Sequence, residues 1–423
     1  MSANFQIPLD IPDVEILSIE KGERNSLILT VKSTLDHTHC RHCQRKITTT
    51  HGYDRPIRLQ HLPIFERKVY IELRPKRYRC PDCDGGPTTT QQLDWYTANS
   101  PHTKALDQWL LKVLINSTVS DTSRCCQVSY DAVEGCIDRY VGQSVNWDQV
   151  EPFATLGLDE IALRKGHKDF VCVVTALDQS DEVIVLAILP DRCKETVLNF
   201  LNSIPEKHKP AIKRVCSDMY EGFMNAAKEA LPEAAVIIDR FHVAKHYNKG
   251  VDDLRKTTLR ALKKTLPESG YSTVKGSMWS FRRHYWDLSG EQQEQLTDLF
   301  LHAPALKQAW LLRHQLFLIY EAPYSPGQAG EKFDAWIQTV RESGLDCFDG
   351  FIRLFEKYRV DILAYFEGRH TSGFVEGLNN KLKVIKRRCF GLLNPSKLFQ
   401  RIQIDLQERT GFLKIMENTT SCG

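Results

Sequence analysis

The spacing of apolar positions changes several times along the 423-residue chain. Up to about residue 98, short runs separated by prolines alternate with a period of two, most clearly at residues 68–74, which is typical of half-buried strands. Residues 105–115 place apolar side chains at three- and four-residue intervals after Thr103, a suitable N-cap, and so predict a helix. We therefore expect a β-rich block over residues 1–98, followed by helices.

The middle of the chain predicts a sheet that is followed by a long helical stretch. The expected strands are 156–163, 170–177, 183–189, 214–216 and 235–238, with helices at 195–203 and 222–231. Three consecutive strands followed by alternating helices and strands is the order of an RNase H-like sheet. After Asp239 the pattern becomes helical to about residue 370, and its tryptophans are expected to anchor the core of an all-α insertion. These are Trp279, Trp286, Trp310 and Trp336.

Length and composition favour a multidomain globular protein, because 42 % apolar residues in a chain of this length are enough for several cores. No apolar run approaches 18 residues, and residues 1–9 lack a charged leader with a long apolar run, so we expect a cytoplasmic protein. Of the 13 cysteines, nine are scattered, which favours reduced thiols over a disulfide framework.

The net charge is only +3, but the basic residues are concentrated in three segments. Residues 40–83 hold eleven Lys/Arg against four Asp/Glu, residues 249–286 hold nine against three, and residues 381–401 hold seven against none. Any one segment could be a solvated face. Three such segments in a nearly neutral chain indicate positioned contacts with the phosphates of a nucleic acid.

Four cysteines form two CxxC pairs, Cys40-Arg-His-Cys43 and Cys80-Pro-Asp-Cys83. Thiolates at this spacing can share one tetrahedral Zn²⁺, and a structural zinc would support a block with a thin core. The 36 residues between the pairs exceed the spacing of a minimal zinc ribbon, so an inserted strand pair must bring them together. Isolated turn cysteines are the alternative, and a redox role is disfavoured because no βαβ pattern surrounds either pair.

Residues 121–126 and 130–141, separated by a three-residue turn, have the lengths of a helix-turn-helix. Ser129 would cap the second helix. Asp131 and Glu134 near its groove-facing end are unfavourable for phosphates, so a plain helical connector is the alternative.

Three carboxylates occupy settings that together predict a two-metal site. Asp159 and Asp218 end apolar strand-like runs, and Glu376 opens a helix rich in Lys and Arg. Two divalent ions about 3.5–4 Å apart can align the attacking and leaving oxygens of a phosphodiester, and carboxylates are ligands that Mg²⁺ prefers. A lone Asp at a strand end is more often a cap or turn residue, so the prediction depends on all three converging at one sheet edge.

Neighbouring acids allow other interpretations. Asp178 precedes Gln-Ser-Asp, which is typical of a hairpin turn, and Glu160 adjoins Asp159. Asp239 and His242 lie three residues apart at a strand-to-helix turn, where they could support the metal site or form a structural pair.

The helix of Glu376 carries polar and basic side chains at three- and four-residue steps, so Glu376, Asn379, Lys383 and Arg387 could share one face. Trp279 and Trp286 could also stack an unpaired base, although tryptophans are more often core. The basic residues expected to contact DNA are Lys381, Lys383, Lys386, Arg387 and Arg388 on this helix, and Arg255, Lys256, Arg260, Arg282 and Arg283 in the insertion.

Several motifs, in order, resemble the ISL3 family of bacterial insertion-sequence transposases over almost the whole chain. They are Gly157-Leu-Asp-Glu-Ile-Ala-Leu-Arg-Lys-Gly-His167, Ser217-Asp-Met219, Ile238-Asp-Arg-Phe-His-Val243, and Val375-Glu-Gly-Leu-Asn-Asn-Lys-Leu-Lys383 with Lys386-Arg-Arg388. The resemblance implies a DDE transposase with Asp159, Asp218 and Glu376 as metal ligands and Asp239 with His242 as an auxiliary element. Ser372-Gly373 stands where many relatives are expected to have Ser-Asn.

The resemblance further implies double-stranded DNA as the partner, namely the terminal inverted repeats of the element and the target DNA, on which the protein would catalyse Mg²⁺-dependent cleavage and strand transfer. It also implies two Mg²⁺ or Mn²⁺ ions, one structural Zn²⁺, and a homodimer that is associated with the bacterial nucleoid when it is bound to DNA. The rivals are a structure-selective DNA nuclease and a domesticated DNA-binding regulator. The expected domains are a zinc-binding domain (1–98), a helix-turn-helix domain (99–150), an RNase H-like catalytic domain in two parts (151–240 and 371–423) and an all-helical insertion (241–370).

Overall fold

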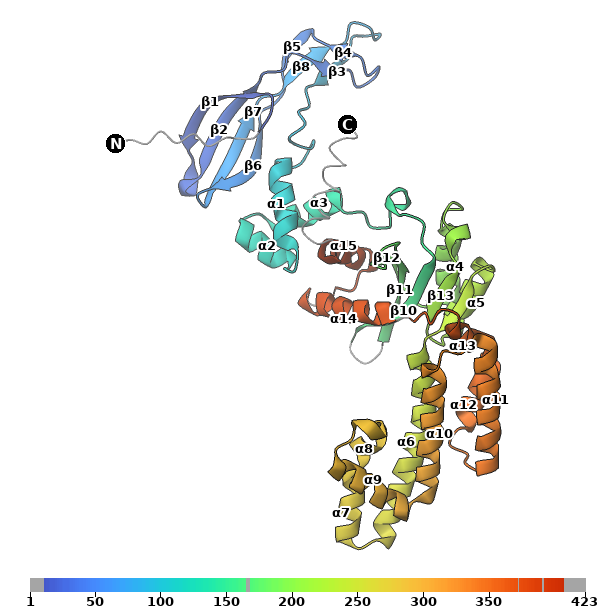
Figure 1. The fold of residues 1–423 in the computed structure, drawn as a ribbon. Helices are drawn as coiled ribbons and strands as arrows, with labels where there is room; N and C mark the ends of the chain where they lie inside the picture. The colour runs from blue at the N-terminus through green and yellow to red at the C-terminus, as the bar shows by residue number, and fades with distance from the viewer. Residues whose placement is uncertain (1–10, 165–167, 372, 390–391, 407–423) are drawn as a thin grey trace. The chain divides into compact units, whose positions relative to one another are not determined.

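The computed structural model describes residues 11–164, 168–371, 373–389 and 392–406 (Figure 1). Predictions that concern residues 1–9, His167, Ser372 and the chain beyond residue 406 lie outside these residues. The described chain forms two compact units, one from residues 11–143 with 400–406 and the other from the described residues of 144–399. Within the described part, no helix is both long and apolar enough to cross a membrane.

The first unit begins with a four-stranded sheet in the order β1-β2-β7-β6. In β7, Val69, Ile71 and Leu73 are buried and alternate with half-buried neighbours, which confirms the predicted period of two. Strands β2 and β7 are parallel, whereas β6 and β7 form an antiparallel hairpin. The bounds are β1 (Val14–Lys21), η1 (Glu23–Asn25), β2 (Leu27–Ser33), β6 (Ile57–Ile64) and β7 (Arg67–Leu73).

Five short strands surround the CxxC pairs. They are β3 (Thr38–His39), β4 (Lys46–Ile47), β5 (Thr50–Tyr53), β8 (Lys76–Arg79) and β9 (Thr88–Thr90). Ile47 and Tyr78 are fully buried there with Cys40 and Cys80, and make a small core of their own. The β6–β7 hairpin lies between the two pairs in the sequence, as the long spacing predicted.

Three helices follow, α1 (Lys104–Leu114), α2 (Val119–Cys126) and α3 (Tyr130–Tyr140). Both predicted caps are confirmed, since Thr103 Oγ1 accepts a hydrogen bond from the Leu106 amide at 3.3 Å and Ser129 Oγ accepts one from Ala132 at 3.1 Å. The end of α15 (Pro395–Leu406) packs on these helices, and the Arg401 guanidinium donates to the Leu114 carbonyl at 2.6 Å.

The second unit contains a five-stranded sheet in the order β12-β11-β10-β13-β14. Strands β10, β11 and β12 are antiparallel, whereas β13 and β14 run parallel to β10. Asp178 Oδ1 accepts bonds from the Ser180 and Glu182 amides at 2.7 and 2.8 Å, which confirms the predicted hairpin turn. The bounds are η2 (Trp147–Gln149), β10 (Thr155–Arg164), β11 (Lys168–Leu177), β12 (Val183–Leu189), α4 (Lys194–Ser203), η3 (Lys209–Ala211), β13 (Arg214–Ser217), α5 (Glu221–Ala230) and β14 (Ala235–Ile238).

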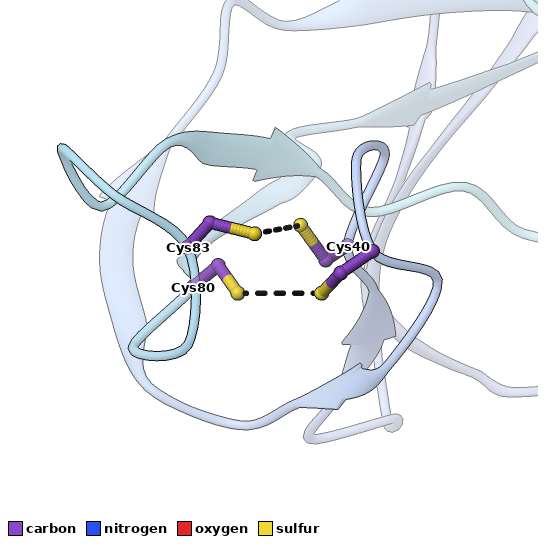
Figure 2. A group of neighbouring side chains, drawn as sticks. Cys40, Cys80 and Cys83 are labelled. Atoms are coloured by element: carbon purple, nitrogen blue, oxygen red, sulfur yellow. Dashed lines mark hydrogen bonds between the residues drawn. The ribbon is translucent and has the colours of Figure 1, made fainter.

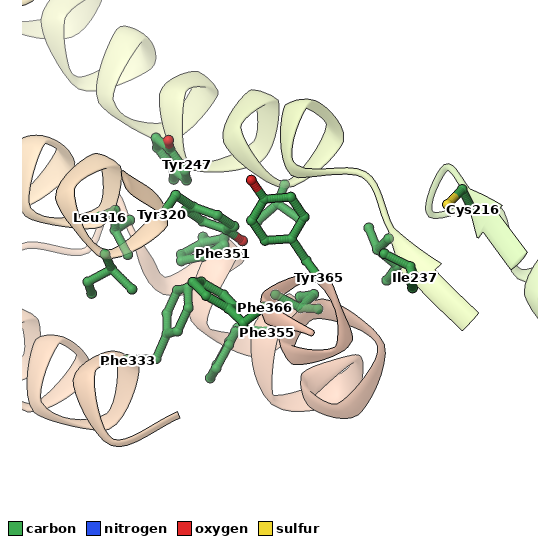
Figure 3. Close-up of a cluster of buried hydrophobic side chains, with 14 of the residues drawn as sticks. Cys216, Ile237, Tyr247, Leu316, Tyr320, Phe333, Phe351, Phe355, Tyr365 and Phe366 are labelled. Carbon is green, nitrogen blue, oxygen red and sulfur yellow. The ribbon is translucent and has the colours of Figure 1, made fainter. Parts of the chain in front are cut away.

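After β14 the described chain is helical up to α14 and contains no further strand before residue 371 (Figure 1). These helices share one hydrophobic core with the sheet, in which Ile237 of β14 lies near Tyr365 and Phe366 (Figure 3). The bounds are α6 (Arg240–Thr265), α7 (Glu268–Gly276), α8 (Met278–Arg282), η4 (Tyr285–Asp287), α9 (Gly290–His302), α10 (Pro304–Glu321), α11 (Pro326–Ser343), α12 (Asp349–Lys357), α13 (Arg359–Leu363), η5 (Ala364–Phe366) and α14 (Gly373–Arg388).

The four tryptophans predicted as core anchors divide into two pairs. Trp310 and Trp336 are 6 % and 3 % exposed, and their indole N–H groups donate to backbone carbonyls at 3.1 and 2.9 Å. Trp279 and Trp286 are 64 % and 58 % exposed, so the core prediction is wrong for them. They lie on the short elements α8 and η4, and apolar spacing could not tell which faces of these elements another helix would cover.

Candidate functional site

Three aspartates lie at one edge of the five-stranded sheet. Leu158 of β10 pairs with Ser217 of β13, and Ser217 pairs with Ile238 of β14, all in parallel register. The residue after each of these three is an aspartate, namely Asp159, Asp218 and Asp239. Strands β13 and β14 end at this level, whereas β10 continues to Arg164. The parallel register therefore brings together acids that are up to 80 positions apart in sequence.

The Asp159 and Asp218 carboxyls are half-buried and interact electrostatically. Burial raises the pKa of Asp159 to about 6, and the Asp218 charge adds to the rise, while the Glu160 amide, which donates to Asp159 Oδ1 at 2.7 Å, opposes it. Burial also raises the pKa of Asp218, against the opposing bond from the Tyr220 amide at 3.0 Å. The edge therefore holds two acids whose negative charges are costly without a cation.

Asp239 and His242 have different relations to this edge. Asp239 is buried and caps α6, because its Oδ1 accepts a bond from the Phe241 amide at 2.6 Å. His242 lies three residues further on, and its electrostatic effect lowers the pKa of both Asp159 and Asp218. The capping bond shows that Asp239 fixes the start of α6. The assignment of Asp239 and His242 as an auxiliary element of the metal site stays a prediction.

Helix α14 packs against β10 at the same place. The Asn379 amide group donates from Nδ2 to Asp159 Oδ2 at 2.5 Å, and Asn379 Oδ1 is buried with no hydrogen-bond partner among the described side chains. A Cβ atom on Gly157 would lie 2.6 Å from Val375 Cγ2, so the missing side chain allows the close approach of α14. Glu376 is in this helix, three residues before Asn379, but its side chain lies outside the described residues.

Arg192 is a residue of this edge that sequence reasoning missed. Its Nη1 is 2.6 Å from Glu160 Oε2, and its guanidinium lies over the rings of Phe170 and Tyr220 at 4.6 and 4.9 Å. Its charge lowers the pKa of Asp218. A single arginine after β12 carries no local motif, and only the antiparallel pairing of β11 and β12 brings it here.

The basic side chains of α14 that were predicted to contact DNA differ in their exposure to solvent. Lys381, Lys383 and Arg387 are exposed, whereas Lys386 is half-buried and donates from Nζ to the Ala162 carbonyl at 2.5 Å. Lys386 thus ties α14 to β10. Arg388 is half-buried.

One of the predicted DNA contacts in the helical segment is not accessible. The Arg255 side chain is 5 % exposed and pairs with Asp252 at 2.9 Å, so its assignment as a phosphate contact is wrong. It lies on the buried face of α6, which the run of charges did not reveal. Lys256 and Arg282 are more exposed but also contact Asp252, at 3.1 and 3.0 Å, while Arg260 and Arg283 are exposed.

The four paired cysteines converge in the first unit (Figure 2). The Sγ atoms are 4.0 Å apart for Cys40 and Cys83 and 3.7 Å apart for Cys43 and Cys80, and all four lie within 4.8 Å of one another. Bonds from the Cys43 and His42 amides lower the pKa of Cys40 to about 6, whereas the neighbouring thiols raise that of Cys83 to about 12. Zn–S bonds of about 2.3 Å in a tetrahedron need S–S distances of about 3.8 Å, so the cluster fits a structural zinc ion.

Comparison with protein families defines the class of protein. Residues 36–83 match the zinc finger of the transposases of IS204, IS1001, IS1096 and IS1165, and residues 91–141 match the helix-turn-helix domain of ISL3-family transposases. Residues 156–402 match the transposase domain of the same family. Since this last match covers more than half of the chain, the protein belongs to the ISL3 family of transposases. The match of residues 91–141 confirms the predicted helix-turn-helix, and the alternative of a plain helical connector is wrong.

Two relatives match along nearly their whole length. The transposase of insertion sequence element IS1001 from Bordetella parapertussis is 28 % identical over 394 residues, which cover 92 % of this chain and 94 % of the relative. The transposase of IS1557 from Mycobacterium tuberculosis is 22 % identical over 422 residues, which cover 94 % and 92 %. The chain is therefore similar to insertion-sequence transposases over more than nine tenths of its length, and it belongs to a class of DNA-processing enzymes.

Proposed function

We propose that this protein binds the terminal inverted repeats of its insertion sequence and catalyses Mg²⁺-dependent DNA cleavage and strand transfer, with Asp159, Asp218 and Glu376 as the metal ligands. The observation that carries the proposal is the junction of β10, β13 and α14. The strand register sets Asp159 beside Asp218, and the bond from Asn379 to Asp159 brings the helix of Glu376 to the same edge. Three antiparallel strands followed by two parallel ones are the arrangement expected of an RNase H-like sheet.

The chemistry of the donor set supports hard divalent cations. Burial and the charges of neighbouring carboxylates hold the pKa values of the two aspartates above their usual range, and a cation would remove both penalties. When bound, two Mg²⁺ or Mn²⁺ ions would activate water for the first cut and the freed 3′-OH for transfer. The Asn379 amide holds one oxygen of Asp159, and so orients the carboxylate before DNA binds.

Other side chains are assigned to the DNA strand. Lys381, Lys383 and Arg387 on the exposed face of α14 would contact phosphates near the scissile bond, because they lie on the helix that reaches the acidic edge. Lys386 and Arg388 would extend this strip, and Lys256, Arg260, Arg282 and Arg283 would contact DNA along the helical segment. Arg192, which already balances Glu160, would limit repulsion between the acids and the DNA backbone.

The remaining expectations form part of the proposal. One Zn²⁺ at Cys40, Cys43, Cys80 and Cys83 would hold the zinc-binding domain, and the helix-turn-helix would read the repeats. A homodimer on DNA, in the bacterial cytoplasm and nucleoid, follows from the need to pair two ends. The proposed domains are those expected from the sequence, with the boundaries 1–98, 99–150, 151–240, 241–370 and 371–423.

The test is to incubate the full chain with DNA that carries the element's ends, Mg²⁺ and a target plasmid. We expect joined products that require the metal and disappear in the Asp218→Asn protein. Cleavage without joining under every condition would favour a structure-selective nuclease. Binding without any metal-dependent cleavage would favour a DNA-binding regulator.

A further inference from the structure

The helical segment contains a cavity of about 250 Å³ between the first turns of α6 and the second half of α10. Its lining includes Arg240, Arg282 and Arg313, two histidines, four Phe or Tyr rings and no acidic side chain. Tyr247 and Tyr320, which lie close together between the two helices in Figure 3, form part of its wall. Its volume is slightly below that of pockets for drug-sized ligands, so it suits one planar ring system with a short substituent.

The aromatic side chains around the cavity form a continuous stack. His284 lies parallel to Trp286 at 5.1 Å and meets Phe317 at 4.1 Å, and Phe317 stacks with His314 at 5.9 Å. Burial lowers the pKa of His314, and the nearby His284 and Arg313 lower it further, which favours a neutral ring. Trp286 is 58 % exposed at one end of the stack, and Phe241 in the cavity wall is 60 % exposed, so ring surface is available to a ligand.

The cavity also carries uncompensated positive charge. The Arg313 guanidinium donates to the Phe281 carbonyl at 2.8 Å, and no carboxylate lies within ion-pair distance among the residues that the structure describes. Burial lowers its pKa to about 10, which still leaves it protonated at neutral pH. Arg240 and Arg282 pair with Glu321 and Asp252, neither of which lines the cavity. Flat rings beside cations, without acids, are the surroundings that suit a base attached to a phosphate.

The cavity begins next to the carboxylate edge. Arg240 and Phe241 line it and directly follow Asp239, the first residue after β14, which pairs with β13. The lining residues of α6 end at Asn248, eight positions after Arg240, which is about 12 Å along a helix. A DNA strand at the carboxylates could therefore place a nearby nucleotide in the cavity. A base that is paired within a duplex could not enter, since both its faces are covered by its neighbours.

We propose that this cavity binds an unpaired nucleotide of the DNA strand on which the carboxylate site acts, with the base against the rings of His284 and Phe317 and the phosphate at Arg313. Trp286 does not line the cavity, but its exposed ring lies parallel to His284 and supports it. The inference rests on the proposed function for the identity of the DNA, but nucleotide binding itself needs no cleavage. Stacking makes the site tolerant of sequence, because every base has a flat face.

The test measures fluorescence anisotropy of a labelled single-stranded 20-mer of deoxythymidine and of a labelled 20-base-pair duplex, in EDTA to prevent cleavage. For Trp286→Ala we expect about tenfold weaker binding of the single strand, within a range of roughly 5- to 100-fold, and less than twofold change for the duplex. Trp286→Phe should restore most of the affinity. Leu301→Ala, which removes another exposed apolar side chain at 73 % exposure, is the matched control and should leave both affinities unchanged.

Two results would overturn the inference: an unchanged single-strand affinity in Trp286→Ala, or an equal loss for both probes, which would indicate a general phosphate surface. Because Trp286 is largely exposed, its removal should leave the thermal midpoint unchanged, and His284→Ala provides a second variant with the same expected selectivity. Asp218→Asn separates the two proposals. Its loss of cleavage tests the carboxylate site, while adding Trp286→Ala to the Asp218→Asn protein should still cause the same selective loss of single-strand affinity.

Discussion

The cysteine cluster and the carboxylate edge assemble their side chains over very different lengths of chain. The cysteines come as two local pairs, and each CxxC turn presents both of its thiols whatever the rest of the protein does. Asp159 and Asp218 meet only through the pairing of β10 with β13, and α14 reaches them after the entire helical segment. The first site is thus defined by turns and the second by a sheet, so they should fail in different ways when they are perturbed.

The largest expected effect is on catalysis. Asp218→Asn should reduce cleavage at the ends by about 10³-fold or more, because it removes a charge that holds the metal while keeping the shape of the side chain. Asp178→Asn is the matched control, since Asp178 only accepts amide bonds in the β11–β12 turn. Initial rates of DNA cleavage measure both variants. Similar losses in the two proteins would contradict a site at the sheet edge.

Next in size is the loss of the zinc cluster. Cys40→Ser with Cys83→Ser should lower the zinc content from about one ion per chain to none, unfold the small core around Tyr78, and weaken DNA binding more than tenfold. The second unit has its own core, so its thermal transition should persist. Metal analysis and calorimetry check these outcomes. Cys125→Ser, at an exposed thiol outside the cluster, should bind zinc normally.

A smaller effect is expected where α14 crosses β10. Gly157→Ala would place a Cβ atom 2.5 Å from Thr175 Oγ1 and 2.6 Å from Val375 Cγ2, and we expect a loss of about 1–3 kcal/mol in unfolding free energy. Activity should fall further, because α14 must shift relative to Asp159. Gly135→Ala, in the middle of α3, is the control, and should be neutral or stabilising by about 0.5–1 kcal/mol. Denaturant unfolding measures the unfolding free energy of both variants. Equal values for the two would contradict the crowding expected at Gly157.

The smallest effect concerns the charge on Asp159 without metal. Its pKa is raised from the ordinary value to about 6, so the folded state favours the protonated carboxyl and loses stability as the pH rises from about 4 to 6. Asp159→Asn should remove this dependence and stabilise the metal-free protein at pH 7 by about 1–2 kcal/mol. Thermal midpoints from pH 4 to 7 in EDTA provide the measurement. Added Mg²⁺ should stabilise the wild type but not the variant. If the difference in thermal midpoint between the two proteins did not change with pH, the charge on Asp159 could not be its cause.

Much of the fold followed from the sequence where the local pattern was complete. The alternation in β7, the caps at Thr103 and Ser129 and the turn at Asp178 each depend on a few neighbouring residues, and the structure contains all of them. The positions of side chains whose role depends on distant partners were harder to predict from the sequence. Arg192 had no local signal, Arg255 was taken for a surface charge, and two of the four tryptophans proved to be exposed.

The sequence by itself determined the chemistry that the chain offers: thiols in two CxxC turns, acids after apolar strands, and cations on the helix of Glu376. These depend on residue type and spacing of a few positions, which the covalent chain sets directly. Only the tertiary structure decided that Asp159 and Asp218 are neighbours, that Asn379 holds Asp159, and that Trp286 stays uncovered. The physical reason is that strand register, helix crossing and burial arise from packing between segments far apart in sequence. The local pattern of one segment does not indicate which distant segment will pack against it.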